Sequence, residues 1–263
     1  MVPVDFAAFV DELADVSGEA ILPFFRTSLS VDNKAGSGGY DPVTAADRAA
    51  EAAMRALIRQ SFPKHGIIGE EFGAERGDAE YVWVLDPIDG TKSFICGMPA
   101  WGTLIGLTRV GEPVYGLMHQ PFVGERFSGD GASARYRGPA GERMLASRAC
   151  ASLADAVLFT TSPLLMNAAD RALFQKVEEQ VRLSRYGGDC YAYCMVAAGH
   201  IDLVIETEIK PYDIAALIPI IAGAGGVITT WDGGTAEKGG RIIAAGDARV
   251  HAAAMALLAG SDQ

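Results

Sequence analysis

Two aspartates three residues apart, Asp86 and Asp89, have the types and spacing best suited to chemistry in this chain. They follow an apolar run at residues 81–85, which predicts a buried strand. We expect that strand to stop at Pro87, because proline has no N–H to donate to a neighbouring strand. Both carboxylates would then leave one strand end and converge on one point.

The residues that follow, Gly90 and Thr91, suit the binding of an anion. A helix that begins near Gly90 would present free backbone N–H groups there. Carboxylates repel an anion unless a cation lies between them. The pattern therefore predicts a divalent cation on Asp86 and Asp89, with a phosphate bound to the cation and to the two amides. The alternative is a simple turn at a strand exit, since Asp and Gly are turn formers.

Composition limits the function classes. The chain has 263 residues, 49% of them hydrophobic, which suits one large or two modest globular domains. The formal charge of −11 argues against a nucleic-acid partner or an anionic membrane surface. The four cysteines form no C-x-x-C pair, and no secretory signal or membrane span is expected. These features indicate a cytoplasmic protein with reduced thiols.

Helical and strand patterns alternate along the chain, which suggests helices packed on sheets. Helices are expected at residues 1–25, 44–60, 168–181, 189–199, 213–224 and 247–258. Strands are expected at residues 66–71, 81–85, 103–110, 113–119, 125–137, 156–160, 201–205, 227–230 and 241–245. Residues 32–39 are rich in Gly and predict a flexible loop. We expect an N-terminal α+β subdomain at 1–140 with most metal ligands, and a C-terminal α/β subdomain at 141–263 that completes the site.

Acidic residues recur where the expected elements begin or end. They are Glu70, Glu71, Asp86, Asp89, Glu206 and Asp213. Folds often place ligand groups at strand ends and helix starts. Ligands that offer only oxygen favour Mg²⁺, Mn²⁺ or Ca²⁺ over zinc. The four histidines are scattered, so no histidine catalyst is expected.

The run of residues 86–91, Asp-Pro-Ile-Asp-Gly-Thr, comes after Gly-Glu-Glu at 69–71 and long before Tyr-Asp at 212–213 and Ala-Gly-Ala-Gly-Gly at 222–226. Together these motifs resemble the inositol monophosphatase family. The resemblance implies a Mg²⁺-dependent, lithium-sensitive phosphomonoesterase that usually forms homodimers. It also implies an α+β fold, a layered αβαβα sandwich like those of inositol monophosphatase and fructose-1,6-bisphosphatase. The segments at 185–193 and 210–213 look most like the histidinol-phosphatase branch.

The resemblance assigns roles to individual residues. It implies that two or three Mg²⁺ ions are held by Glu70, Asp86, Asp89, Asp213 and the carbonyl of Ile88. Glu70, together with a Thr91–Asp47 pair, would activate the attacking water. Gly90, Thr91 and Lys92 would contact the substrate phosphate. Lys92 and Ser93 stand where many relatives carry Thr-Asn, a departure that bears on substrate preference.

The choice of substrate depends on two further acids. In the family, the positions of Glu206 and Asp189 face the alcohol part of the substrate. Two carboxylates there suit a positively charged leaving group, because each can accept a charge-assisted hydrogen bond from an ammonium. Inositol offers only hydroxyls, whereas histidinol phosphate carries an amine and an imidazole. The sequence therefore predicts an L-histidinol-phosphate phosphatase of histidine biosynthesis.

Several alternatives stay open from the sequence. The enzyme could instead be an inositol-1-monophosphatase or a broad small-molecule phosphatase. A regulator that senses phosphate or metal without turnover is a non-enzyme alternative. Asp189 and Asp213 could merely cap helices, and Asp47 likewise. Glu71 could be a solvated neighbour of the site or a residue just behind its ligands.

Overall fold

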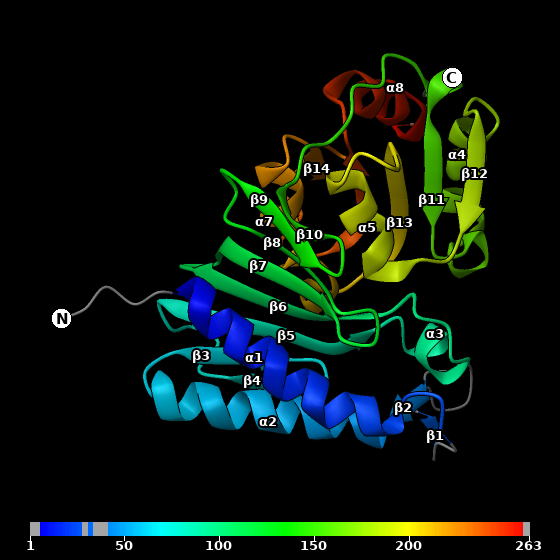
Figure 1. Cartoon of the computed structure of the whole chain (residues 1–263). Helices are drawn as coiled ribbons and strands as arrows, with labels where there is room; N and C mark the ends of the chain where they lie inside the picture. Colours follow the sequence, from blue (N-terminus) through cyan, green and yellow to red (C-terminus); the bar gives the residue numbers. More distant parts are fainter. Residues whose placement is uncertain (1–5, 28–30, 34–41, 260–263) are drawn as a thin grey trace.

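The computed structural model describes residues 6–27, 31–33 and 42–259. Within them, five layers alternate between helices and sheets (Figure 1). Helices α1 and α2 cover one face of a large sheet, and α5 and α7 separate that sheet from a smaller one. Helices α4 and α8 cover the outer face of the smaller sheet. The predicted layered α+β sandwich is confirmed.

The first half of the chain forms the large sheet and its outer helices. The helices are α1 (Phe6–Ile21), α2 (Ala45–Ser61) and the short α3 (Thr91–Ile95). The strands lie in the order β10-β9-β8-β7-β6-β5-β3-β4, and only β3 and β5 pair in parallel. Their bounds are β3 Gly66–Gly69, β4 Gly73–Glu75, β5 Tyr81–Asp89, β6 Gly102–Arg109, β7 Glu112–Gln120, β8 Glu125–Gly129, β9 Ala134–Gly138 and β10 Gly141–Met144. A separate two-stranded sheet joins β1 (Val31–Asn33) to β2 (Pro42–Thr44).

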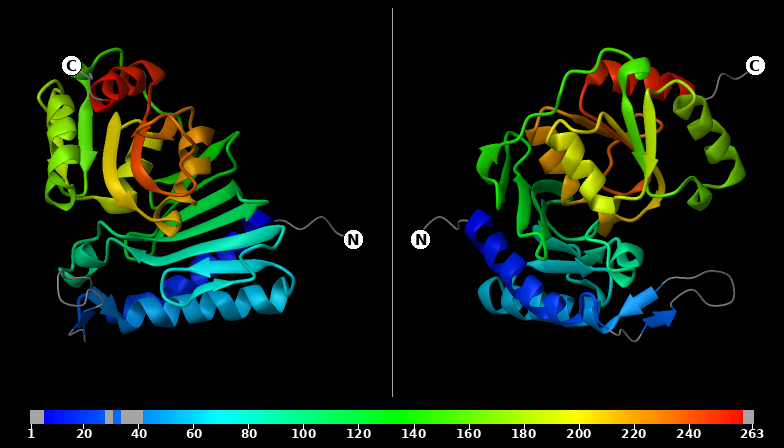
Figure 2. Two further views of the ribbon diagram at one scale, coloured as in Figure 1. Left: turned by 180° about the vertical axis from the view of Figure 1, so that it is seen from behind. Right: turned by 45° about the vertical axis from the view of Figure 1, so that its right-hand side comes forward.

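The second half forms the smaller sheet, in the order β12-β11-β13-β15-β14 (Figure 2). The strands are β11 Val157–Thr160, β12 Leu183–Tyr186, β13 Leu203–Ile209, β14 Val227–Thr230 and β15 Gly240–Ala245. The helices are α4 Ala168–Glu178, α5 Asp189–Ala197, α6 Pro211–Ile214, α7 Leu217–Gly223 and α8 Ala248–Leu258. Three 3-10 turns, at Leu22–Phe24, Leu153–Asp155 and Pro163–Leu165, complete the described elements.

The prediction that Pro87 stops its strand was wrong. Strand β5 continues to Asp89, and its pairing with β6 shifts register between Asp86 and Asp89. The bulge accommodates a residue without an N–H, and the hydroxyl of Thr103 donates a hydrogen bond of 2.8 Å to the Pro87 carbonyl. The bulge therefore lets both aspartates remain on one strand.

Other boundaries also differ from expectation. Residues 125–137 form two strands, because Oδ1 of Asp130 accepts hydrogen bonds from the amides of Ala132 and Ser133 and closes a turn between β8 and β9. The helix expected at 213–224 is divided into α6 and α7. Strands β1, β2, β4, β10 and β12 were not anticipated, and residues 32–33 of the expected loop belong to β1. Most of the loop expected at 32–39 lies outside the described residues.

The predicted division at residues 140 and 141 falls inside the β9–β10 hairpin. The last strand of the large sheet ends at Met144, so the chain passes to the smaller sheet after that residue. The existence of two separate subdomains stays a prediction.

A row of glycines brings the two halves into close contact. Gly106, Gly116 and Gly129 are direct partners across β6, β7 and β8. A Cβ on Gly116 would lie 1.9 Å from the carbonyl oxygen of Ala216, and one on Gly129 would lie 2.5 Å from that of Pro219. Only glycine leaves room for the backbone around α7 to lie this close to the sheet.

Candidate active site

Three aspartates from both halves of the chain meet at one point. Carboxylate oxygens of Asp86, Asp89 and Asp213 lie within 4.8 Å of one another. Asp86 and Asp89 come from the end of β5, and Asp213 comes from α6. The expected convergence of the two β5 aspartates, and their meeting with Asp213, is what the structure shows.

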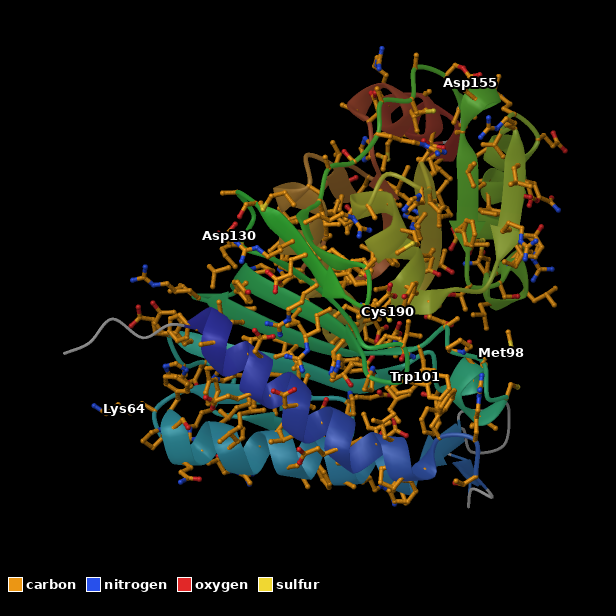
Figure 3. All side chains as sticks on the ribbon, viewed as in Figure 1. Lys64, Met98, Trp101, Asp130, Asp155 and Cys190 are labelled. Carbon is orange, nitrogen blue, oxygen red and sulfur yellow. The ribbon has the colours of Figure 1, made fainter. Side chains whose placement is uncertain are left out.

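Backbone groups orient two of these carboxylates. Oδ2 of Asp89 accepts a hydrogen bond of 2.5 Å from the amide of Cys190, in the first turn of α5. Figure 3 labels Cys190 at this end of α5, above the strands of the large sheet. Oδ2 of Asp213 accepts a 2.8 Å bond from the amide of Lys210, so Asp213 does help to cap α6. In both residues the capping or orienting contact leaves Oδ1 for another partner.

A second group of acids lies beside the first. Carboxylate oxygens of Asp47, Glu70 and Glu71 also lie within 4.8 Å of one another. The side chain of Glu71 is only 2% exposed and lies 3.5 Å from Arg48, so it is not a solvated neighbour. Asp47 is buried on α2.

The turn after β5 has the geometry that its glycine allows. Gly90 takes the left-handed conformation, with φ of 84°, and precedes the first residue of α3. A Cβ at this position would lie 2.9 Å from the carbonyl oxygen of Ala100. The hydroxyl of Thr91 donates a 3.0 Å hydrogen bond to the carbonyl of Ile88, which links two positions expected to serve the site.

The aspartate cluster has the properties of a cation site. Burial raises the pKa of Asp86 well above its ordinary value, and the charges of Glu70, Asp89 and Asp213 raise it further. Burial likewise raises the pKa of Asp89 strongly and that of Asp213 to about 7. Oδ1 of Asp86 is buried, with no hydrogen-bond partner among the described residues. Crowded, buried carboxylates of this kind fit a divalent cation with oxygen ligands.

A cavity of about 440 Å³ opens beside the cluster. The residues around it come from both halves and include Glu70, Asp89, Gly90, Thr91, Lys92, Thr161, Asp189, Tyr193, Glu206, Glu208, Lys210 and Asp213. The expected contacts for phosphate and alcohol therefore share one cavity with metal-ligand candidates from both halves.

Asp189 does not cap its helix with its side chain. The residue before α5 is Gly188, and no side-chain capping bond is formed there. The Asp189 carboxylate instead accepts a 3.2 Å bond from the Ser93 hydroxyl and lies 3.5 Å from the Thr161 hydroxyl. Its φ of 44° is unusual for a residue with a Cβ. Such strain recurs at functional sites, where the surrounding structure maintains it.

Glu206 is buried beside Asp189 and already has several partners. Oε1 accepts bonds from the amide (2.8 Å) and hydroxyl (2.5 Å) of Thr161, and Oε2 accepts a 2.8 Å bond from the Tyr193 hydroxyl. Burial raises the pKa of both Glu206 and Asp189. Because Thr161 has one hydroxyl proton and its shorter contact is to Glu206, Asp189 keeps more capacity to accept from a ligand.

Several residues at or near the site were not identified from the sequence. Thr161 carries no motif, and Tyr193 enters only as the last residue of the 185–193 segment, with no role assigned; both meet Glu206 through the fold. Glu51 and Arg55 are spaced four apart on α2, which is a detectable signal for an ion pair. Their burial beneath residues 69–73 was not visible in the sequence.

Comparison with known proteins decides the family. Residues 4–262 match the family described as "Inositol monophosphatase family". The chain belongs to the inositol monophosphatase family. Its members are metal-dependent phosphomonoesterases, and the acidic clusters described above suit that chemistry.

Individual relatives in this family carry two kinds of name. The chain is 43% identical to "Bifunctional phosphatase IMPL2, chloroplastic" of Arabidopsis thaliana, over 95% of this chain and 74% of the relative. It is 35% identical to a "Histidinol-phosphatase" of Chlorobaculum parvum, over 82% of each. Among solved structures, an inositol monophosphatase from Zymomonas mobilis is 42% identical, with a TM-score of 0.85 over 95% of this chain and 96% of that one.

Proposed function

We propose that this phosphatase hydrolyses L-histidinol phosphate to L-histidinol and phosphate, with Mg²⁺ as its cation. The observation that carries the proposal is a group of acids that line the cavity in addition to the candidate metal ligands, and we call this group the acidic wall. Asp189, Glu206 and the exposed Glu208 all lie on that wall. The name of the Chlorobaculum parvum relative, a histidinol-phosphatase, is consistent with this choice.

The cation site would use Asp86, Asp89, Asp213, Glu70 and the Ile88 carbonyl as ligands, for two or three ions. A bound Mg²⁺ would supply Lewis acidity, lowering the pKa of a water and neutralising phosphoryl oxygens. In this proposal Glu70, with Thr91 and Asp47, receives the proton of the attacking water. The amides of Gly90 and Thr91 and the Lys92 ammonium hold the phosphate.

The acidic wall favours a cationic alcohol. A carboxylate that is buried and only partly satisfied by hydroxyls gains most from a charged donor. Asp189 meets that description, since the hydroxyls of Ser93 and Thr161 donate hydrogen bonds to it, and the Lys92 charge nearby lowers its pKa without offsetting the effect of burial. Inositol 1-phosphate would bring only hydroxyls to this wall. It remains the second candidate, because the Zymomonas mobilis neighbour is named an inositol monophosphatase.

Phosphate release from a panel of substrates tests the proposal. The panel contains histidinol phosphate, inositol 1-phosphate, fructose 1,6-bisphosphate and 3′-phosphoadenosine 5′-phosphate, each assayed with Mg²⁺. We expect the highest kcat/KM for histidinol phosphate. A preference for inositol 1-phosphate would overturn the substrate assignment, and no release from any substrate would favour a regulator.

Replacement of Asp189 tests whether this residue recognises the amine of the substrate. Asp189→Asn should lower kcat/KM for histidinol phosphate about tenfold or more, the scale of one ~1.4 kcal/mol interaction, and leave a neutral phosphomonoester nearly unchanged. Glu208→Gln is the control, because it removes the same charge from an exposed position on the same cavity and should cost less. Equal losses on both substrates would mean that Asp189 supports the site without recognising the amine.

Three further properties belong to this proposal. We expect a homodimer, inhibition by lithium, and a location in the cytoplasm. Sedimentation that detects only a monomer would contradict the first, and full activity in millimolar LiCl would contradict the second. No helix in the described part of the chain is both long and apolar enough to cross a membrane.

A further inference from the structure

A buried ion pair beneath the metal-binding turn has no part in the functions considered so far. Glu51 and Arg55 lie one turn apart on α2, and their side chains are 0% and 4% exposed. Nε of Arg55 lies 2.7 Å from Oε1 of Glu51. Burying two charges is costly unless their remaining hydrogen-bonding capacity is satisfied.

The partners that satisfy this pair are backbone groups next to the metal-ligand candidates. Oε2 of Glu51 accepts a 2.7 Å bond from the amide of Glu71, and Oε1 accepts a 3.2 Å bond from the amide of Phe72. Arg55 in turn donates a hydrogen bond to the carbonyl of Gly73. The pair thus connects α2 to three successive residues of the turn after β3.

Gly69 shows how closely the turn and the pair fit together. A Cβ at position 69 would lie 2.0 Å from Oε1 of Glu51. The backbone of Gly69 does not need a left-handed conformation, so the requirement here is space. Gly69 also pairs with Leu85 of β5, the residue before Asp86. The carboxylate of Glu51 therefore lies directly under the backbone that leads to Glu70.

Repulsion among the acids of this turn explains why such support is needed. The carboxylates of Asp47, Glu70 and Glu71 lie within 4.8 Å of one another, and like charges at that separation push a turn apart. Glu51 holds the turn through N–H groups, and Arg55 supplies the opposite charge from below. No side chain of the pair has to enter the cavity.

We infer that Glu51 and Arg55 are positioning residues that hold the Glu70–Glu71 turn in its cation-binding geometry. The inference rests on the proposed metal dependence, but not on which alcohol the enzyme releases. Groups that orient metal ligands commonly change metal affinity by about 10- to 100-fold when they are removed. A pair that only stabilised the fold would lower the melting temperature without changing the response to Mg²⁺.

The test compares Glu51→Gln with Arg59→Gln in the full-length enzyme. Arg59 lies one turn further along α2, is 52% exposed and pairs with Glu75, whose carboxylate also lies 3.8 Å from Arg55. Arg59→Gln therefore removes a charge from the exposed edge of the same network without removing a bond to residues 69–73. Two quantities are measured: the Mg²⁺ concentration for half-maximal phosphate release, and the Mg²⁺ concentration that produces half of the rise in melting temperature. The second readout does not depend on turnover.

We expect Glu51→Gln to raise both half-maximal Mg²⁺ concentrations about tenfold or more, while kcat at saturating Mg²⁺ falls far less. Arg59→Gln should leave both unchanged. If Glu51→Gln lowers the folding yield, Arg55→Lys provides a second variant that keeps the charge but loses the planar contact, with an intermediate shift. Wild-type Mg²⁺ dependence in either folded variant, whatever its melting temperature, would overturn the inference.

A separate outcome concerns the metal itself. If Mg²⁺ raises neither activity nor melting temperature in the wild-type enzyme, the proposed metal dependence fails. That result is distinct from a failure of the pair to affect a response that the wild type does show.

Discussion

At the scale of single residues, the carboxyl groups of the site are buried close together, and this arrangement opposes their ionisation. Asp213 has a pKa of about 7, first because it is buried and also because Glu70 and Glu206 lie near. The hydrogen bond from the Lys210 amide lowers the pKa of Asp213, but not enough to return it to its ordinary value of 3.8. The folded, metal-free protein therefore binds a proton here that the unfolded chain, with an ordinary value of 3.8, has released.

This linkage predicts a pH dependence that Mg²⁺ should reverse. Without metal, the folded state holds more protons than the unfolded state between the two pKa values, so stability should fall as pH rises from about 4 to about 7. With Mg²⁺, the ligands must be deprotonated, so apparent Mg²⁺ affinity should rise over the same range. Melting temperatures in EDTA and in MgCl₂, at a series of pH values, measure both slopes.

Asp213→Asn is the matched variant for this prediction. It removes the titrating group, so the slope in EDTA should become flatter and the Mg²⁺ response should weaken. The same slope in the wild type and the variant would show that other groups control the pH dependence.

Sequence reading succeeded best at this scale where residues are neighbours in the chain. Asp86 and Asp89 are three positions apart at the end of one strand, so their shared place was predictable, whereas the β-bulge between them was not. The contact of Thr161 with Glu206 joins residues 45 positions apart. No local preference encodes it, because it depends on how β11 and β13 lie in the smaller sheet.

At the scale of elements, tight packing between α7 and the large sheet fixes where Asp213 lies. Helix α6 carries Asp213, and the chain then runs over the glycines of β6, β7 and β8. The sequence shows many glycines but not which of them face a helix. The division into α6 and α7 was likewise missed, because the apolar pattern runs through residues 213–224 without a break.

Gly116→Ala tests this arrangement. Its Cβ would meet the carbonyl oxygen of Ala216 at 1.9 Å, so the backbone after α6 must move. We expect a loss of about 1–3 kcal/mol in the free energy of unfolding, typical of overpacking, together with weaker Mg²⁺ binding through the displaced Asp213. Chemical denaturation and Mg²⁺ titration measure the two effects.

The control is Gly77→Ala, where the added Cβ would find its nearest neighbour at an ordinary 3.7 Å. It should change neither quantity appreciably. If Gly116→Ala behaves like Gly77→Ala, the sheet and helix have more freedom than their separation indicates.

At the scale of the whole molecule, the proposed cation site joins two halves that otherwise contact each other mainly through α5, α6 and α7. Asp86 and Asp89 belong to the large sheet, and Asp213 follows the smaller one. The layered fold was predictable from the alternation of helices and strands and from the family resemblance. The order of the strands was not, since it depends on pairings such as that of β11 with both β12 and β13.

A ligand shared by both halves should stabilise the whole chain. One site at 100 times its Kd adds about 2.7 kcal/mol to the free energy of unfolding, which for a chain of this size raises the melting temperature by roughly 5–10 °C. We also expect Mg²⁺ to slow amide hydrogen exchange in two distant segments at once, residues 86–91 and residues 211–214. Exchange followed by mass spectrometry, with and without Mg²⁺, measures this directly.

Asp213→Asn separates a bridging cation from one held by a single half. If the cation bridges the halves, the variant should lose the Mg²⁺-dependent protection at 86–91 as well as at 211–214, because the remaining proposed ligands lack the carboxylate from α6 and bind the cation weakly. Protection that persists at 86–91 in the variant would place the cation wholly on the large-sheet half. In that case α6 would approach the site through the glycine row alone, and Mg²⁺ would contribute little to holding the two sheets together.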